Sequence, residues 1–314
     1  MILEQTAARQ TKLLSLLRRE FGLSAGLVKR LKWQNALFVN GAPAHTDCPV
    51  QPGDRVRVVL EEQTEGFDPE PMPLSILYED PYFLAVDKPA GMLVHPSPQK
   101  NSGTLANGVL YHLQQSAAGA GVHPVTRLDR DTFGVVLLAK NANVHDRFCR
   151  LLREKQLEKT YLASVFGHPP QDAGEIDLPV YKIGGGNLIR IVDERGQKAL
   201  TQYRVLERAE KTALLELHPL TGRTHQLRLH CMASGFPILG DPQYASPEST
   251  ARSAQLGLTH QLLCAARLAL THPVTGEQLT LRSAYRLELQ KLVARPPQDV
   301  YNVEEQCYGA TPQR

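Results

Sequence analysis

The sequence predicts a mixed α+β fold that is rich in β-strands. Short apolar runs bounded by turn residues recur from residue 74 onward, and the run over 133–139 is continuous. Apolar residues also recur at helical spacing, as at positions 144, 148, 151 and 152. Strands combined with such helices indicate the α+β class. The 314 residues, 42% of them hydrophobic, are enough for two or three packed domains.

The first 60 residues predict a small module of helices and strands. Two helices are expected within 11–35, and Ser24 is the expected N-cap of the second. A short strand is expected over 36–39, followed by a hairpin turn at Asn40-Gly41. A further strand is expected over 55–60.

Basic residues are concentrated in this module. Positions 9–59 hold nine basic and three acidic residues, in a chain whose net charge is only +3. By itself this charge suits either a solvated basic surface or a site for a polyanion. The module resembles the RNA-binding domain of ribosomal protein S-four type in Ser24, Lys29, Val39-Asn40-Gly41 and Pro52-Gly53-Asp54. That resemblance implies that the module binds RNA.

An acidic stretch separates this module from the rest of the chain. Positions 61–70 hold five acids and no base, and prolines stand at 69, 71 and 73. Such a composition is typical of a linker. We therefore expect a small basic domain over 1–60, a linker over 61–73, a main domain over 74–294 and a loosely ordered tail over 295–314.

The main domain is expected to alternate strands with a few helices. The expected strands cover 76–79, 83–86, 133–139, 161–166, 199–206, 212–217, 263–270 and 278–282. One helix is expected around Val144 to Leu152, and another is expected to begin near Thr224.

A charged segment directly precedes the strand over 133–139. Its residues Arg127, Asp129, Arg130 and Asp131 fall within five positions. Charged residues at the end of a buried strand often form a functional site. A surface loop of salt bridges is the other interpretation, and local evidence alone favours it.

A second segment, Leu220 to His230, contains a turn followed by the expected helix. Its residues Arg223, Thr224 and His225 stand where backbone N–H groups and the helix dipole can hold a phosphate. If the helix includes Thr224, Arg228 lies one turn later on the same face. An amphipathic helix with solvated bases is an equally good local interpretation.

Two further segments are weak by themselves. Lys88 opens a turn with Pro89 and Gly91, which alone indicates only a loop. Tyr161 stands at the start of a strand, where a tyrosine is more often part of the core.

Taken in this order, the four segments resemble the RluA-type family of pseudouridine synthases, which act on ribosomal and transfer RNA. The runs RLDRDTFG and LTGRTHQLRLH carry the resemblance, and 237–241 supports it. It implies that 74–294 is a catalytic domain with a mixed, largely antiparallel sheet, flanking helices and a central RNA cleft. The chain departs from the family at Thr126, where His is usual, and at Phe133, where Ser is usual.

The resemblance also implies roles for individual residues. Asp129 is the expected catalytic carboxylate, Arg228 its partner cation, and Tyr161 a contact for a uracil flipped out of its stack. Arg127 is expected to fill the space that the base leaves. The other expected substrate-binding residues are Lys88, Arg130, Arg223, Thr224 and His225.

Pseudouridine formation leaves the mass of the nucleotide unchanged, so no redox cofactor, ATP or metal is expected. His225, His230 and Cys231 do not have the spacing of a zinc site. Asp129 and Asp131 are too close in the chain to act as the two separated carboxylates of a hydrolytic glycosidase. The expected partner is ribosomal or transfer RNA, bound by a monomer.

Composition also bears on the cellular compartment. The chain has five cysteines, an odd number, and no CxxC pair, which favours a reducing compartment. It contains no apolar run near the roughly 20 residues that a membrane helix needs and no signal-peptide pattern. A cytoplasmic protein without a membrane partner is therefore expected. Two alternatives stay open, namely a non-catalytic RNA-binding protein on a synthase scaffold and a ribosome-assembly factor with incidental activity.

Overall fold

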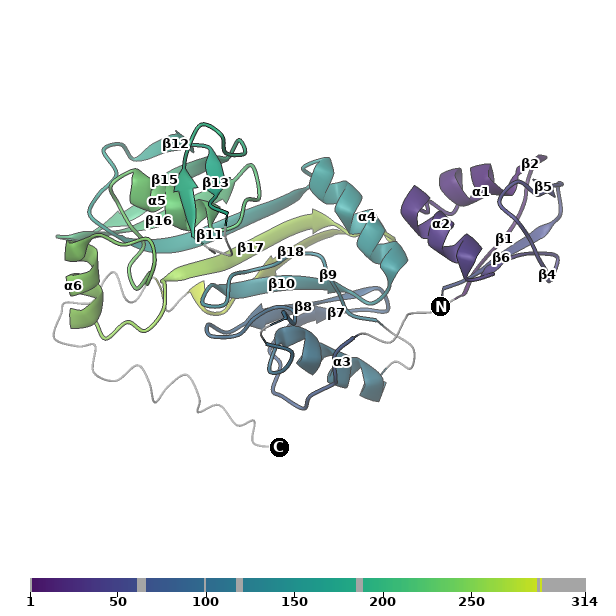
Figure 1. Ribbon diagram of the computed structural model, residues 1–314, viewed down its shortest axis with the longest axis horizontal. Coiled ribbons are helices and arrows are strands. Elements are labelled where there is room, and N and C mark those ends of the chain that lie inside the picture. The colour runs from purple at the N-terminus through teal and green to yellow at the C-terminus, as the bar shows by residue number, and fades with distance from the viewer. Residues whose placement is uncertain are drawn as a thin grey trace.

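The computed structural model describes residues 2–60, 66–98, 100–116, 121–184, 189–286 and 289. These residues form a small N-terminal sheet with two helices and a larger mixed sheet with helices on both faces (Figure 1). The expected tail over 295–314 and the linker residues 61–65 lie outside the described residues.

The N-terminal module has its own sheet, in the order β1-β6-β3-β4, and its own hydrophobic core. Its elements are β1 (Ile2–Thr6), β2 (Thr11–Lys12), α1 (Leu13–Arg19), α2 (Ala25–Trp33), β3 (Leu37–Val39), β4 (Ala42–Pro43), β5 (Pro49–Val50) and β6 (Arg55–Val59). Asn40 and Gly41 have φ angles of 50° and 82°, as a tight hairpin turn between β3 and β4 requires. Both expected helices and the expected hairpin turn are therefore confirmed.

Ser24 links this module to the main domain. Its hydroxyl oxygen accepts a hydrogen bond from the N–H of Leu27, which confirms it as the N-cap of α2. The same hydroxyl donates to the carboxylate of Asp146 on helix α4 (Ala142–Arg153). Arg147 of that helix also donates to the carbonyl of Phe21, at 3.4 Å. The start of helix α2 in the N-terminal module and helix α4 in the main domain therefore meet through polar contacts around Ser24.

The main sheet has the order β12-β15-β16-β11-β17-β10-β8-β7, with β18 paired to β17 and β9 to β10. Its strands are β7 (Ile76–Glu79), β8 (Phe83–Lys88), β9 (His123–Pro124), β10 (Phe133–Ala139), β11 (Leu157–Phe166), β12 (Ala173–Asp177), β15 (Leu200–Arg208), β16 (Thr212–Pro219), β17 (Leu263–Thr271) and β18 (Gln278–Arg282). A separate hairpin joins β13 (Val180–Lys182) to β14 (Arg190–Val192). Only β10 and β17 pair in parallel within the described sheet, so the expected largely antiparallel fold is confirmed.

Helices cover both faces of this sheet. On one face, α4 packs over β8, β10 and β17, and α5 (Gln226–Ala233) packs over β11 and β16. On the other face, α3 (Leu105–Ser116) packs over β8 and β10. The chain after α6 (Pro247–Gln255) packs over β10, β11 and β17. The charged segment before β10 comes to the side of the sheet that carries α5, because Arg228 of α5 donates to Asp129 of this segment.

The start of α5 differs from expectation. The helix begins at Gln226, and His225 precedes it with a left-handed φ of 59°. Thr224 is therefore outside the helix, so the expected shared helical face of Thr224 and Arg228 is wrong. The reason is local, because a left-handed residue turns the chain sharply and cannot continue an α-helix.

Gly134 allows the close approach of β10 and β17. Its φ is +110°, and a Cβ atom there would lie 2.4 Å from the carbonyl oxygen of Ala265. Any other residue would therefore collide with the backbone of β17. This contact fixes where the charged segment before β10 ends relative to β17.

Candidate active site

Asp129 lies in a tight loop between β9 and β10. The hydroxyl of Thr126 accepts from the N–H of Leu137 at 2.9 Å, and the carbonyl of Asp129 accepts from the N–H of Thr132 at 3.2 Å. Thr126 is 7% exposed, so its side chain stabilises the loop from inside and is not presented at the surface. These bonds hold the loop against β10 and leave the side chain of Asp129 partly open, at 28% exposure.

Arg228 reaches Asp129 from α5. Its Nη1 donates to Oδ2 of Asp129 at 3.1 Å. Its Nε and Nη2 donate to the two oxygens of Asp241 at 2.7 and 2.9 Å, which is the bidentate fork that guanidinium forms with a carboxylate. Asp241 is fully buried and Arg228 is nearly so. One buried cation therefore joins two carboxylates, of which only Asp129 faces solvent.

The charges of this cluster support each other. Burial alone would lower the pKa of Arg228, but the hydrogen bonds and negative charge of Asp241, with those of Asp129, raise it. The Tyr244 ring packs 5.0 Å from the guanidinium carbon, which adds a cation–π contact. A permanent cation therefore lies 3.1 Å from Oδ2 of Asp129.

Tyr161 projects from β11 into the same region. Burial raises the pKa of its hydroxyl, and the negative charge of Asp129 raises it further. Its phenol is therefore neutral at neutral pH. It lies close enough to Asp129 for the charge of that carboxylate to affect the pKa of the hydroxyl. The strand register pairs Tyr161 with Leu217 on one side and Ala265 on the other, which fixes its direction.

His225 forms another wall of the site. Its Nδ1 lies 2.9 Å from the hydroxyl of Tyr244, and its Nε2 lies 3.9 Å from Oδ2 of Asp129. The same tyrosine hydroxyl accepts from the N–H of Arg190 at 2.7 Å. Burial lowers the pKa of His225, and Arg228 and Arg190 oppose its protonation, although Asp129 favours it. The imidazole is therefore neutral at neutral pH.

The remaining expected residues divide into two groups. Arg127 and Thr224 are exposed, and Arg223 donates to the carbonyl of Lys198 at 3.2 Å from an exposed position. Arg130 is also exposed and forms a bidentate pair with Asp131, at 3.0 and 2.9 Å. Arg127 and Arg130 flank Asp129 in the sequence, and Arg223 and Thr224 precede α5. These four side chains do not join the buried cluster around Arg228.

Lys88 does not lie where a substrate can reach it. It is 0% exposed, and its amine donates to the carbonyls of Pro89, Met92 and Arg130 at 2.7, 2.8 and 2.9 Å. Burial lowers its pKa to about 7, while the charges of Asp131 and Asp129 counteract the decrease. The expectation of a direct substrate contact is thus contradicted, because all three N–H donors already bind the backbone. Lys88 instead ties the turn after β8 to the Asp129 loop.

Replacing Lys88 by Met is expected to lower the free energy of unfolding by about 3 kcal/mol, because three buried carbonyls lose their donor. Urea unfolding followed by circular dichroism measures the change. Lys198→Met, at an exposed position, is the control and is expected to change it by less than about 0.5 kcal/mol. A loss below about 1 kcal/mol for the Lys88 variant would contradict this assignment.

Phe133 and His230 have structural surroundings. Phe133 makes edge-on contacts with the rings of His260 and Tyr285, at centroid distances of 5.9 and 5.7 Å, inside the core on the face opposite α5. His230 is buried, with its two ring nitrogens 2.9 Å from the Thr201 hydroxyl and the Leu178 carbonyl. No three His, Cys, Asp or Glu side chains of the described residues are grouped as a metal site requires.

Sequence reasoning missed four members of the site, namely Asp241, Gln243, Tyr244 and Arg190. Gln243 accepts from Nη2 of Arg228 at 3.1 Å. The run over 237–241 supported the resemblance, but nothing in its spacing indicated a second carboxylate for Arg228. Arg190 comes from the β13–β14 hairpin, whose sequence carries no signal for this position.

Comparison with known proteins identifies the family. Residues 82–233 match the family model described as RNA pseudouridylate synthase. A Bacillus subtilis protein named as an uncharacterized RNA pseudouridine synthase, YlyB, is 37% identical over 262 residues, which are 82% of this chain and 84% of that protein. Ribosomal large subunit pseudouridine synthase D of Nitrosomonas europaea is 36% identical over 80% of this chain and 74% of its own length.

A solved structure supports the same family assignment. Human RNA pseudouridylate synthase domain containing 4 superposes with a TM-score of 0.56 at 27% identity, covering 70% of this chain and 93% of its own. The matched segment includes the Asp129 loop, Tyr161 and Arg228. The chain therefore belongs to the family of RNA pseudouridine synthases and is an isomerase that acts on RNA.

Proposed function

We propose that Asp129 is the carboxylate that carries out the isomerisation. The observation that carries this proposal is the partly exposed Asp129 bound to an Arg228 that Asp241 anchors from the buried side. Such an arrangement fixes one carboxylate beside a cation while leaving it open to a ligand. The two oxygens of Asp241 are occupied, so it serves to position Arg228.

The reaction breaks the C1′–N1 bond of uridine and joins C1′ to C5 of the rotated base. Asp129 can attack C1′, stabilise positive charge on the ribose or assist removal of a sugar proton. In each case its negative charge must lie beside the sugar. Tyr161 is proposed to contact the flipped uracil as a neutral phenol, and exposed Arg127 to occupy the space that the base leaves.

The substrate is proposed to be ribosomal RNA, because several relatives are named for the large ribosomal subunit. The test uses the purified protein with large-subunit ribosomal RNA and, separately, transfer RNA, both labelled with tritium at C5 of uridine. Tritium release from the ribosomal RNA is expected. Release from transfer RNA alone would show that the substrate is transfer RNA and not ribosomal RNA. Release from neither would favour a non-catalytic RNA-binding or assembly role.

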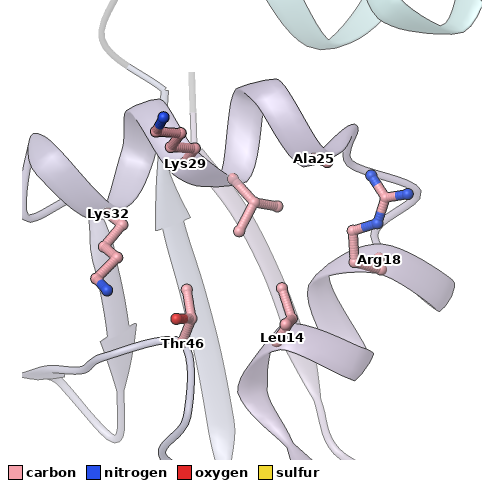
Figure 2. A pocket seen from close by; sticks show the side chains of 7 residues that line it. Leu14, Arg18, Ala25, Lys29, Lys32 and Thr46 are labelled. Atoms are coloured by element: carbon pink, nitrogen blue, oxygen red, sulfur yellow. The ribbon is translucent and has the colours of Figure 1, made fainter.

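Residues 1–60 are proposed to be an RNA-binding module of the S-four type. A groove of about 340 Å³ lies between α1 and α2, lined by Leu14, Arg18, Ala25, Val28, Lys29, Lys32 and Thr46. Figure 2 shows Lys29 and Lys32 on one side of this groove and Leu14 and Arg18 on the other. No acidic side chain lines it, so its charge suits the RNA backbone.

Changing Lys29 and Lys32 together to Gln is expected to weaken RNA binding about tenfold and to reduce its dependence on salt by about two phosphate contacts. Trp33, the one tryptophan of the chain, is 77% exposed on α2, so its fluorescence can report binding. Arg55→Gln, on the exposed side of β6, is the control and should retain the wild-type affinity. Equal RNA affinity of the double variant and the control would show that this groove does not bind RNA.

No helix of the described residues is both long enough and apolar enough to span a membrane. The monomeric state and the cytoplasmic location stay predictions, and sedimentation of the purified protein tests the first.

A further inference from the structure

Lys159 lies two residues before Tyr161 on β11. Alternate residues of a strand share a face, and two positions span about 7 Å. On this face Leu157 packs into the cluster under α4, while Ala163 packs into the cluster under α5. Tyr161 packs against the cluster under α5, and Lys159 therefore lies between this tyrosine and the cluster under α4.

The surroundings of Lys159 offer it no counter-ion. It lines a cavity of about 10 Å³ with Thr126, Tyr161 and apolar neighbours that include Val135 and Leu268. The hydroxyl of Thr126 is already bonded to the N–H of Leu137. No acidic side chain lines this cavity.

The nearest acid along the strand is engaged elsewhere. Glu158 lies within 3.6 Å of Arg267, which also donates to the hydroxyl of Thr160 at 3.4 Å. Residues 158 and 160 alternate with 159, so the side chains of Glu158 and Thr160 are on the opposite face of β11. Arg267 also lines the cavity of Lys159, as a second positive residue rather than a partner.

Lys159 is thus a partly buried ammonium without a partner. Its side-chain amine makes no hydrogen bond or ion pair with any residue in the described part of the chain. Burial lowers its pKa, and no neighbouring charge restores it. A desolvated, unpaired lysine is unfavourable in the free protein, and an anion bound at its amine would compensate for the lost hydration.

We propose that Lys159 binds an RNA phosphate next to the target uridine. The inference rests on the proposed function, because it takes Asp129 and Tyr161 as the place of that uridine. Lys159 is two residues from Tyr161 on the same face of β11. Its amine is therefore within reach of the RNA backbone that flanks a flipped nucleotide. RNA presents a phosphate on each side of every internal nucleotide, so the class of ligand is a phosphodiester anion.

The test compares Lys159→Met with Lys159→Arg. The probe is the large-subunit ribosomal RNA labelled at C5 of uridine. The Met variant is expected to raise KM about tenfold, with most of the loss on KM rather than kcat. Its log–log salt dependence should fall by about one phosphate contact. The Arg variant should recover most of the affinity. Lys211→Met, at an exposed turn before β16, is the control and should behave as wild type.

Thermal unfolding separates this role from a structural one. Removing an unpaired, desolvated charge should raise the Tm of Lys159→Met, whereas removing a structural contact would lower it. A lower Tm together with unchanged KM and salt dependence would overturn the proposal.

Repeating the binding measurement in the Asp129→Asn background keeps the two proposals distinguishable. Lys159→Met should weaken RNA binding there too, although no turnover occurs. Loss of turnover tests Asp129, and loss of the salt-dependent contact tests Lys159. Equal RNA affinity with and without the Lys159 change would overturn the phosphate assignment alone.

Discussion

Pseudouridine formation by the Asp129→Asn variant is expected to fall by at least about 10³-fold, with the fold intact. Asn has the same shape and can still accept from Nη1 of Arg228, but it carries no negative charge and is a poor nucleophile. Losses of this size are typical when a group that acts in the transition state is removed. Tritium release from C5-labelled RNA measures the loss.

The fold should survive because Arg228 keeps its second carboxylate. Two of its hydrogen bonds go to Asp241, at 2.7 and 2.9 Å, and do not involve Asp129. The free energy of unfolding should therefore change by no more than about 1 kcal/mol. RNA affinity should be equal to that of the wild type or slightly higher, since a negative charge near phosphates has been removed.

Asp131→Asn is the matched control for this variant. Asp131 lies two positions away in the same loop, but its carboxylate pairs with exposed Arg130 rather than with Arg228. Its activity is expected to decrease by less than about tenfold. Activity of Asp129→Asn within tenfold of wild type would remove Asp129 from the proposed chemistry.

Replacing Arg228 by Met is expected to lower the free energy of unfolding by about 3–5 kcal/mol. The change removes the two guanidinium hydrogen bonds to Asp241, whose side chain is 0% exposed, and leaves a buried charge with no cation beside it. Activity should be lost as well, because Asp129 loses its partner cation. Urea unfolding measures the first effect and tritium release the second.

The carboxylate of Asp241 would keep its charge at neutral pH only at the cost of burying it without a cation. Unfolding at neutral pH is therefore the condition under which the deficit of Arg228→Met is measured.

A double variant gives the control. Arg228→Met combined with Asp241→Asn removes both buried charges and keeps the Oδ1 acceptor for the N–H groups of Gln243 and Tyr244. It should recover much of the stability, because no buried charge is left unpaired. Its activity should stay low, since Asp129 still has no cation. Recovery of activity in the double variant would show that Arg228 matters only for folding.

Local features of the sequence were enough to predict many elements. The Asn40-Gly41 turn and the N-cap Ser24 were predictable because each depends on a few adjacent residues. Helix α3 was not predicted, although Leu105, Val109 and Leu113 recur at helical spacing and are buried against the sheet. The strands β12, β13 and β14 lack long apolar runs, so only their partners in the sheet identify them.

The sequence by itself determined the family, the mixed sheet and the segments that supply Asp129, Tyr161 and Arg228. Tertiary structure alone decided where these side chains meet. Arg228 and Asp129 lie 99 positions apart and meet through the packing of α5 on the sheet, while Asp241 joins them from another loop. Lys88 likewise became a buried link between loops because its amine meets three carbonyls there. Hydrogen bonds require atoms to meet within about 3 Å, and strand register and helix packing set such distances rather than spacing along the chain.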